Sequence, residues 1–227
     1  MSLQQDQLKQ MAAQAAIDYI APHLQADMIL GIGTGSTADL FIDALGALRS
    51  KFKGAVASSE RSAARLKNVD ITVFDLNEVS FIRFYIDGAD EINVNLDMIK
   101  GGGGALTHEK IVASVAQQFI CIVDQSKCVE ILGQFPLPIE VIELSVQAVM
   151  RWAIAQGGQP SIRANFKTDN GHPIIDIKGL KISHPKDFES ALDHVAGVVT
   201  NGLFALRGAD VALVASLEGV KTLLRPT

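Results

Sequence analysis

Four short segments of the chain carry residues that could do chemistry. The first is rich in glycine and hydroxyl groups, Gly31-Ile32-Gly33-Thr34-Gly35-Ser36-Thr37. The second is acidic, Asp87-Gly88-Ala89-Asp90-Glu91-Ile92-Asn93. The third joins a lysine and four glycines to a glutamate, Lys100-Gly101-Gly102-Gly103-Gly104-Ala105-Leu106-Thr107-His108-Glu109-Lys110, and the fourth is Asp124-Gln125-Ser126-Lys127. Together they offer N–H groups for an anion, carboxylates that can move protons, and cations.

The glycine-rich segment is typical of a phosphate-binding turn. Glycines let the backbone approach a ligand, and the helix expected from residue 38 would present N–H groups and a partial positive charge. Thr34, Ser36 and Thr37 add hydroxyl donors. A dinucleotide fingerprint would need glycine where Ser36 stands, and no Gly-Lys-Ser/Thr follows as in a Walker loop. A small phosphate is the simpler ligand; a plain tight turn with a serine cap is the alternative.

The acidic segment directly follows an apolar stretch. Asp87 and Asp90 could bind sugar hydroxyls or shuttle protons, and they could also bind a divalent cation. The calcium-loop pattern is absent from the segment. A solvated turn that caps a helix is the alternative interpretation.

The run of four glycines is costly in backbone entropy, which favours a role for its N–H groups. Such groups can cradle a developing oxyanion, with the charge of Lys100 beside them. Glu109 would lie on the first turn of the next helix. A flexible linker is the alternative for this run, and a surface lysine is the alternative for Lys127.

These groups match the needs of an aldose–ketose isomerase that works through an enediol. A carboxylate base moves a proton between C1 and C2, while cations and N–H donors stabilise the enediolate oxygens. A phosphate anchor at the other end of the substrate supplies orientation. Glu109 is the expected base, with Asp87 and Lys100 completing the catalytic set. No cofactor or metal ion is required in principle.

The hydrophobic pattern predicts alternating strands and helices up to about residue 131. Strands are expected at 26–30, 53–58, 71–74, 81–86 and 119–124, and helices at 3–20, 38–48, 63–66 and 107–117. This alternation predicts an α/β fold with a mostly parallel sheet and helices on both faces, whose ligand site lies beyond the strand ends.

The pattern changes near Gly133-Gln134-Phe135-Pro136-Leu137-Pro138. Helices at 145–155 and 185–194, with strands near 162 and at 174–177 and 198–204, predict a small α+β domain. A last strand at 211–215 could return to the first sheet. We therefore expect a larger domain of residues 1–131 and 207–227, and a smaller domain of residues 132–206.

Composition excludes several other classes of protein. A net charge of -5 disfavours a nucleic-acid partner, and no apolar segment is long enough to cross a bilayer. The N-terminus lacks a secretory pattern, so a cytoplasmic location is expected. Cys121 and Cys128 form no C-x-x-C motif and are expected to remain thiols. The five histidines show no ligand spacing for zinc, and no metal site is expected.

Four ordered motifs, GIGTGSTA, DGADEIN, KGGGGALTHEKI and DQSK, resemble those of the type A ribose-5-phosphate isomerases. The similarity covers nearly the whole chain and includes GQFPLPIEV, TDNG and GVVTNGLFALRGADVAL. It implies a Rossmann-like larger domain and a ferredoxin-like smaller one. It also implies interconversion of D-ribose 5-phosphate and D-ribulose 5-phosphate in the non-oxidative pentose phosphate pathway of carbohydrate metabolism, no cofactor, and a homo-oligomer, commonly a dimer.

The resemblance also implies roles for individual residues. Glu109 matches the family's catalytic base. The aspartates of the D-G-A-D loop are placed at the ring oxygen and hydroxyls in the family, and the lysine–glycine loop lies on the oxyanion side. The positions that match substrate contacts are Lys9, Thr34, Gly35, Ser36, Thr37, Asp87, Gly88, Ala89, Asp90, Lys100, Gly101, Gly102, Gly103 and Lys127.

Two stretches depart from the family pattern. Ser58-Ser59-Glu60-Arg61-Ser62 replaces a more usual serine- and threonine-rich stretch, and Gly104 stands where alanine is frequent. The first departure could alter contacts in the substrate pocket.

Three other functions compete with the isomerase. A dinucleotide-binding protein would use Glu60, after the second strand, to bind a ribose, but Ser36 and the glycine run speak against it. A sugar-phosphate sensor would need an output module, and none is visible in the 227 residues. An amino-sugar-phosphate or acyl-transfer enzyme is disfavoured by the combination of D-G-A-D with K-G-G-G.

Overall fold

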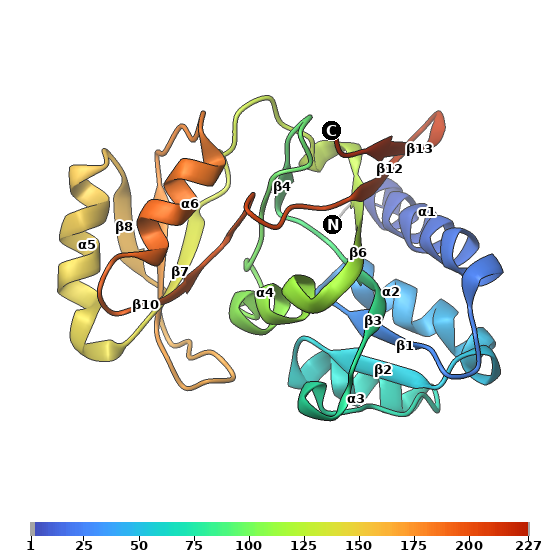
Figure 1. Ribbon diagram of the computed structural model, residues 1–227. Coiled ribbons are helices and arrows are strands. Elements are labelled where there is room, and N and C mark those ends of the chain that lie inside the picture. The colour runs from blue at the N-terminus through green and yellow to red at the C-terminus, as the bar shows by residue number, and fades with distance from the viewer. Residues whose placement is uncertain (1–2, 227) are drawn as a thin grey trace. The chain divides into compact units, whose positions relative to one another are not determined.

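The computed structural model describes residues 3–226, and the chain divides into two compact units (Figure 1). Unit 1 comprises Met1–Gly88, His108–Ser126 and Ala209–Thr227, and unit 2 comprises Ala89–Thr107 and Lys127–Gly208. Three terminal residues of the predicted larger domain lie outside the described residues, namely Met1, Ser2 and Thr227.

Unit 1 is built on a six-stranded sheet in the order β13-β12-β6-β3-β1-β2. All neighbours pair parallel except β13, which is antiparallel to β12 at one edge. The strands are β1 (Ile29–Ile32), β2 (Gly54–Ala57), β3 (Ile82–Asp87), β6 (Ala116–Asp124), β12 (Val211–Ser216) and β13 (Gly219–Leu224). The mostly parallel sheet is confirmed, and because β1, β2, β3 and β6 are parallel, their carboxyl ends lie at one edge of it.

Helices cover both faces of this sheet (Figure 1). They are α1 (Leu3–Ile20), α2 (Ser36–Leu45), α3 (Glu60–Asn68) and α4 (Leu106–Val115), with 3-10 helices η1 (Ala21–His23), η2 (Gly46–Lys51) and η3 (Leu76–Glu78). α1 and α2 pack against Phe84 of β3 in one apolar core. On the other face, Val112 of α4 and the ring of Tyr85 pack against Gly31. Because strand residues alternate between faces, Asp87 shares the face of Tyr85.

The strand expected at residues 71–74 is wrong. Only Val73 forms a bridge there, to Ala55 of β2. Asp70, with a φ of 59°, turns the chain just before this segment, and Asp75 caps η3 just after it. Thr72 O and Phe74 N–H both bond to Ala55 of β2, but within residues 71–74 no second bridge extends this pairing into a strand. The helix expected at 107–117 also ends earlier, because β6 begins at Ala116.

Unit 2 contains a four-stranded antiparallel sheet, in the order β10-β7-β9-β8, and a three-stranded one, in the order β11-β5-β4. Their strands are β4 (Glu91–Ile92), β5 (Met98–Ile99), β7 (Leu137–Val141), β8 (Gln159–Ile162), β9 (Ile174–Lys178), β10 (Val198–Asn201) and β11 (Leu203–Phe204). The helices are α5 (Val146–Ala155), α6 (Pro185–Asp193) and the 3-10 helix η5 (Glu143–Ser145). Val149 and Leu192 bring α5 and α6 into one apolar core with β7 and β9, so the predicted α+β module is confirmed.

The central strand β7 was not predicted, because prolines at 136 and 138 argue against a strand interior. Pro138 pairs with Asp176 of β9, and its carbonyl accepts a hydrogen bond from Gly202 N–H on the other side. In a strand, the carbonyl and the N–H of one residue point to the same neighbouring strand. The side on which Pro138 lacks an N–H is therefore the side of Gly202. Since β10 has already ended at Asn201, the ladder loses little there.

The extent of unit 2 differs from the expected domain of residues 132–206. Residues 89–107 join unit 2 because β5 pairs with β11, and Lys100 N–H donates to Gly202 O at 2.8 Å. These pairings link segments about a hundred residues apart in the chain, which a local hydrophobic pattern does not reveal.

Three further expectations concern the chemistry of the chain as a whole. Cys121 is buried in β6, Cys128 is exposed, and neither takes part in a disulfide, as predicted. No helix within residues 3–226 is long and apolar enough to cross a membrane. Within the same range, no group of three His, Cys, Asp or Glu side chains is arranged to hold a metal ion.

Candidate active site

The chain passes between the two units within three of the four segments that carry candidate site residues. It does so after Gly88, Thr107 and Ser126, and once more after Gly208. The predicted site residues are therefore divided. Unit 1 holds Lys9, Thr34, Gly35, Ser36, Thr37, Asp87, Gly88 and Glu109, and unit 2 holds Ala89, Asp90, Lys100, Gly101, Gly102, Gly103 and Lys127.

The glycine-rich segment forms a tight turn from β1 into α2. Gly35, with a φ of 134°, is the N-cap of α2, so the N–H groups of the first helical turn, from Ser36 onward, open onto this turn. Gly33 lies directly against Asp87, since a β-carbon there would come within 1.9 Å of Asp87 Cγ. The turn has the geometry of an anion-binding helix N-terminus.

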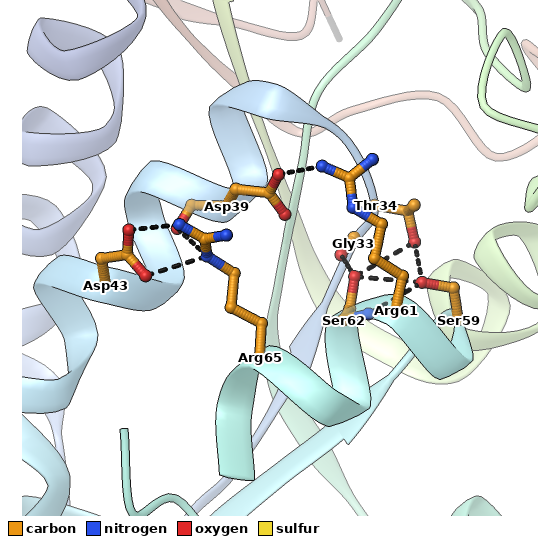
Figure 2. Close-up of polar contacts among 8 residues, drawn as sticks. All are labelled: Gly33, Thr34, Asp39, Asp43, Ser59, Arg61, Ser62 and Arg65. Carbon is orange, nitrogen blue, oxygen red and sulfur yellow. Dashed lines mark hydrogen bonds and ion pairs between the residues drawn. The ribbon is translucent and has the colours of Figure 1, made fainter. Parts of the chain in front are cut away.

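The side chain of Thr34 does not face open solvent but enters a cluster of serine hydroxyls (Figure 2). Thr34 Oγ1 lies 2.9 Å from Ser58 Oγ, 2.7 Å from Ser59 Oγ and 3.3 Å from Ser62 Oγ. Ser62 Oγ also donates to the carbonyl of Gly33 at 2.7 Å. The hydroxyl of Thr34 therefore holds the turn in place.

The stretch 58–62, which departs from the family pattern, thus supports the turn. Ser59 caps α3 by accepting a hydrogen bond from Ser62 N–H. Arg61 pairs with Asp39 of α2, and Arg65 Nε donates to Asp43 Oδ1 at 2.9 Å (Figure 2). The hydrogen bond to Asp43 raises the pKa of the Arg65 guanidinium. These contacts tie α3 to α2.

Asp87, at the end of β3, is completely buried and accepts hydrogen bonds at both carboxylate oxygens. Oδ1 accepts the N–H of Thr34 at 3.1 Å and the N–H of Gly88 at 2.7 Å. Oδ2 accepts the phenol of Tyr85 at 2.5 Å. Asp87 therefore links the acidic segment to the glycine-rich turn.

Glu109 lies in the first turn of α4 and is 3% exposed. It is close enough to influence Tyr85, whose pKa is raised well above its usual value. Burial is the main cause, followed by the charges of Asp87 and then Glu109. The candidate base and the candidate substrate aspartate therefore act on one phenol in unit 1.

Tyr85 was not predicted as a site residue. Its position two residues before Asp87 puts it on the same face of β3, and this spacing could have found it. Its ring packs against Phe119 of β6, with centroids 4.8 Å apart.

Lys9 and Ser36, both expected at the phosphate, line the same cavity of about 450 Å³ in unit 1. Lys9 comes from α1 and is buried, whereas Ser36 opens α2. A cation from one helix and the N-terminus of another therefore meet at one hollow, whose lining also includes Asp6, Asp39 and Arg65.

In unit 2, the glycine run is held by its neighbours. Gly102 N–H donates to Asp90 Oδ2 at 2.8 Å. The buried Lys100 has its Nζ atom 5.4 Å from the centroid of the Phe204 ring. Ala89 is half-buried, as is Lys127, which ends the 3-10 helix η4 (Gln125–Lys127).

The second departure, Gly104, has a local cause. Its φ is 86°, and a β-carbon there would lie 2.1 Å from Cζ of Phe166. Alanine at this position would require Phe166 to move. Glycine at 104 and phenylalanine at 166 are therefore a matched pair in this chain.

Two further groups contact the predicted segments but were missed. Arg163 donates to the carbonyls of Gly101 and Gly102, at 3.3 and 3.1 Å. Glu140 of β7 is completely buried and accepts hydrogen bonds from Thr107 and from three residues of one turn, Thr168, Asn170 and His172. Both depend on how distant strands pair, and no local spacing in the sequence signals them.

The position of Glu60 does not favour the alternative of a dinucleotide-binding protein, in which this carboxylate would bind a ribose. It is an exposed residue in the first turn of α3, three positions beyond the end of β2. A dinucleotide-binding carboxylate would be expected at the strand end itself.

The parallel sheet, the turn at the end of β1 and the buried carboxylates beside it define an α/β protein of the Rossmann-like class with a candidate acid–base site. The family model described as Ribose 5-phosphate isomerase A (phosphoriboisomerase A) matches residues 54–219. The chain belongs to this family.

Curated relatives and solved structures agree with this assignment. Ribose-5-phosphate isomerase A of Bordetella petrii is 58% identical over 224 residues, which cover 99% of this chain and all of the relative. The crystal structure of ribose 5-phosphate isomerase A from Neisseria gonorrhoeae is 45% identical, covers 98% of both chains and gives a TM-score of 0.93. A D-ribose-5-phosphate isomerase in complex with phospho-erythronic acid is 36% identical, with a TM-score of 0.89 over 96% of this chain and 98% of its own.

Proposed function

We propose that the protein interconverts D-ribose 5-phosphate and D-ribulose 5-phosphate through a cis-enediolate. The observation that carries this proposal is the arrangement around Tyr85. Its phenol binds Asp87, which also binds the glycine-rich turn, and the charge of Glu109 acts on the same phenol. An acid–base carboxylate and an anion-binding turn in one compact unit are the parts that this isomerisation needs.

In the proposed mechanism, Glu109 is the base. It removes the proton from C2 of open-chain ribose 5-phosphate and returns it to C1, while the proton on the C2 hydroxyl passes to the oxygen on C1. The enediolate carries negative charge between these two steps, and Lys100 with the N–H groups of the glycine run stabilises it. Donors of this kind contribute about 10²–10³-fold each when they are preorganised.

The remaining residues bind and orient the substrate. Lys9 and the turn at residues 34–37 hold the phosphate. Asp87 and Asp90 lie at the ring oxygen and accept hydrogen bonds from the sugar hydroxyls. Gly88, Ala89, Gly101, Gly102, Gly103 and Lys127 complete the proposed substrate contacts. Nothing in this scheme calls for a cofactor or a metal ion.

Replacing the base tests the mechanism. Glu109→Gln keeps the size of the side chain and removes only its ability to accept the proton, so kcat should fall by about 10²-fold or more. The affinity for ribose 5-phosphate, measured by titration calorimetry, should stay within a few-fold of that of the unaltered protein. Near-normal turnover would refute the role of Glu109.

The matched control is Glu218→Gln, which makes the same change at an exposed turn and should leave kcat unaltered. Activity that survives prolonged chelation would support the metal-free scheme, and its abolition would redirect attention to Asp87 and Asp90. A large rise in melting temperature with a nicotinamide cofactor would instead favour a dinucleotide-binding protein.

The setting of the reaction is also part of the proposal. We place the protein in the cytoplasm, in the non-oxidative pentose phosphate pathway, and as a homodimer that binds a small phosphorylated pentose rather than nucleic acid or membrane. Sedimentation equilibrium should give about twice the chain mass of 24.3 kDa; a monomer at micromolar concentration would contradict the dimer.

A further inference from the structure

We propose that Arg163 is a positioning residue that sets the glycine run for oxyanion binding. Arg163 follows β8, some sixty residues beyond the run in sequence. Its Nη1 atom donates to two successive carbonyls, Gly101 O at 3.3 Å and Gly102 O at 3.1 Å. Gly101 O also accepts the N–H of Gly104 at 2.9 Å, which closes a turn within the run. Glycines have no side chain with which to fix their own peptide planes, so Arg163 adds a contact from outside the run to this turn.

The geometry of the trans peptide then fixes where the N–H groups point. In a trans peptide the carbonyl and the N–H point in opposite directions. The peptide from Gly101 to Gly102 directs its carbonyl to Arg163 and its N–H to Asp90 Oδ2, at 2.8 Å. It is therefore held from both sides.

The next peptide, from Gly102 to Gly103, is held by Arg163 through its carbonyl alone. Its N–H must point away from the guanidinium, as the N–H of Gly102 does toward Asp90. The space beside the α-carbon of Gly103 is open, with no atom within 4 Å of a β-carbon built there. We assign the Gly103 N–H as the donor that Arg163 orients toward a substrate oxygen.

Arginine suits this task because its guanidinium is rigid and always charged. The Arg163 guanidinium is itself held by the carboxylate of Asp176 in β9. Arg163 Nε donates to Asp176 Oδ2 at 2.9 Å, and Arg163 Nη2 donates to Asp176 Oδ1 at 2.5 Å. The guanidinium carbon also lies 5.3 Å from the centroid of the Phe166 ring. A cation bound to a peptide carbonyl polarises the peptide and makes its N–H a stronger donor.

This inference rests on the proposed function, since the oxyanion is the enediolate of the isomerisation. It predicts that Arg163 acts on the charged intermediate and not on the phosphate. Phospho-erythronic acid, the ligand of the related isomerase structure, carries a carboxylate at one end and a phosphate at the other. The carboxylate of phospho-erythronic acid resembles the enediolate oxygens, whereas inorganic phosphate resembles only the phosphate end of the substrate. Comparing the two inhibitors therefore separates an effect on the intermediate from an effect on phosphate binding.

The test is Arg163→Met, which removes the donors and keeps an unbranched side chain. We expect kcat to fall by about 10-fold or more, below the effect of losing an oxyanion donor outright, with KM changed by less than about 3-fold. The inhibition constant of phospho-erythronic acid should rise by a factor similar to the fall in kcat, and that of inorganic phosphate should not change. Arg163→Lys, which retains the charge but not the fork, should recover only part of the loss.

Lys167→Met is the matched control, because it breaks an exposed ion pair with Glu143 in the same unit. It should behave as the unaltered protein. If Arg163→Met does not fold, as judged by circular dichroism, Asp176→Asn should give a smaller effect of the same sign. Unchanged kcat and inhibition in a folded Arg163→Met, or equal weakening of both inhibitors, would overturn the assignment. Should the unaltered protein fail to isomerise ribose 5-phosphate, the proposed function fails, and calorimetric binding of the two inhibitors still tests Arg163.

Discussion

Tyr85 is a phenol placed among negative charges. It is buried, it donates to Asp87, and Glu109 is close enough to raise its pKa further. A phenol in such surroundings keeps its proton, because the phenolate would be both desolvated and repelled. It therefore serves Asp87 as a permanent hydrogen-bond donor and not as an acid of the reaction.

The raised pKa of Tyr85 predicts how stability changes at alkaline pH. In the unfolded chain a tyrosine loses its proton near pH 10, about its ordinary pKa, whereas folded Tyr85 keeps it. The folded state then binds more protons than the unfolded state, so stability falls as the pH rises from about 10 toward the folded pKa. Tyr85→Phe should be less stable at neutral pH but should lose this alkaline dependence.

Melting temperatures measured from pH 8 to pH 11 would check this prediction. Tyr19 is the other tyrosine of the chain, and its hydroxyl accepts a hydrogen bond from the Gln118 amide at 3.4 Å. Tyr19→Phe should therefore keep the alkaline slope of the unaltered protein. The same slope in all three proteins would contradict the role given to Tyr85.

At the scale of elements, the turn between β1 and α2 depends on hydrogen bonds from its surroundings. It has few contacts of its own, and its position is set by the hydroxyls of Ser58, Ser59 and Ser62 on one side and by Asp87 on the other. The carbonyl of Gly33 and the hydroxyl of Thr34 are the points of attachment. Helix α3 and its cap thus act as a support for the phosphate end of the proposed site.

Thr34→Val removes this attachment without changing the shape of the side chain. Buried serine hydroxyls would lose a partner, so the protein should be destabilised by about 1–3 kcal/mol. Because the turn would also be less fixed, KM for ribose 5-phosphate should rise more than kcat falls. Thr34→Ser, which keeps the hydroxyl, should retain most of the stability and affinity in denaturant titrations and steady-state assays. Equal behaviour of the two variants would show that the hydroxyl cluster is not what holds the turn.

The elements could be predicted from sequence where a short apolar run stands between turn-forming residues. This holds for β1, β2, β3, β6 and β12. Prediction fails at residues 71–74, where apolar residues lie between two turns. It also fails at β7, where Pro138 is tolerated because its missing N–H faces the end of β10. In both places the outcome depends on neighbours far away in the chain.

Over the whole molecule, the sequence predicts the motifs of the candidate site but not what supports them. The glycine-rich turn, the acidic segment and the glycine run could be found because each is a local pattern. Arg163 could not, since its link to Gly101 requires the pairing of β8 with β9 and the return of β11 to β5. The extent of unit 2 was missed for the same reason.

The repeated passage of the chain between the units has a consequence for descent. Unit 1 is assembled from three separate stretches and unit 2 from two, with junctions inside the acidic, glycine and lysine segments. Because neither unit is a single stretch of sequence, one crossover between two genes cannot replace one unit with that of a relative and leave the other unit entirely unchanged.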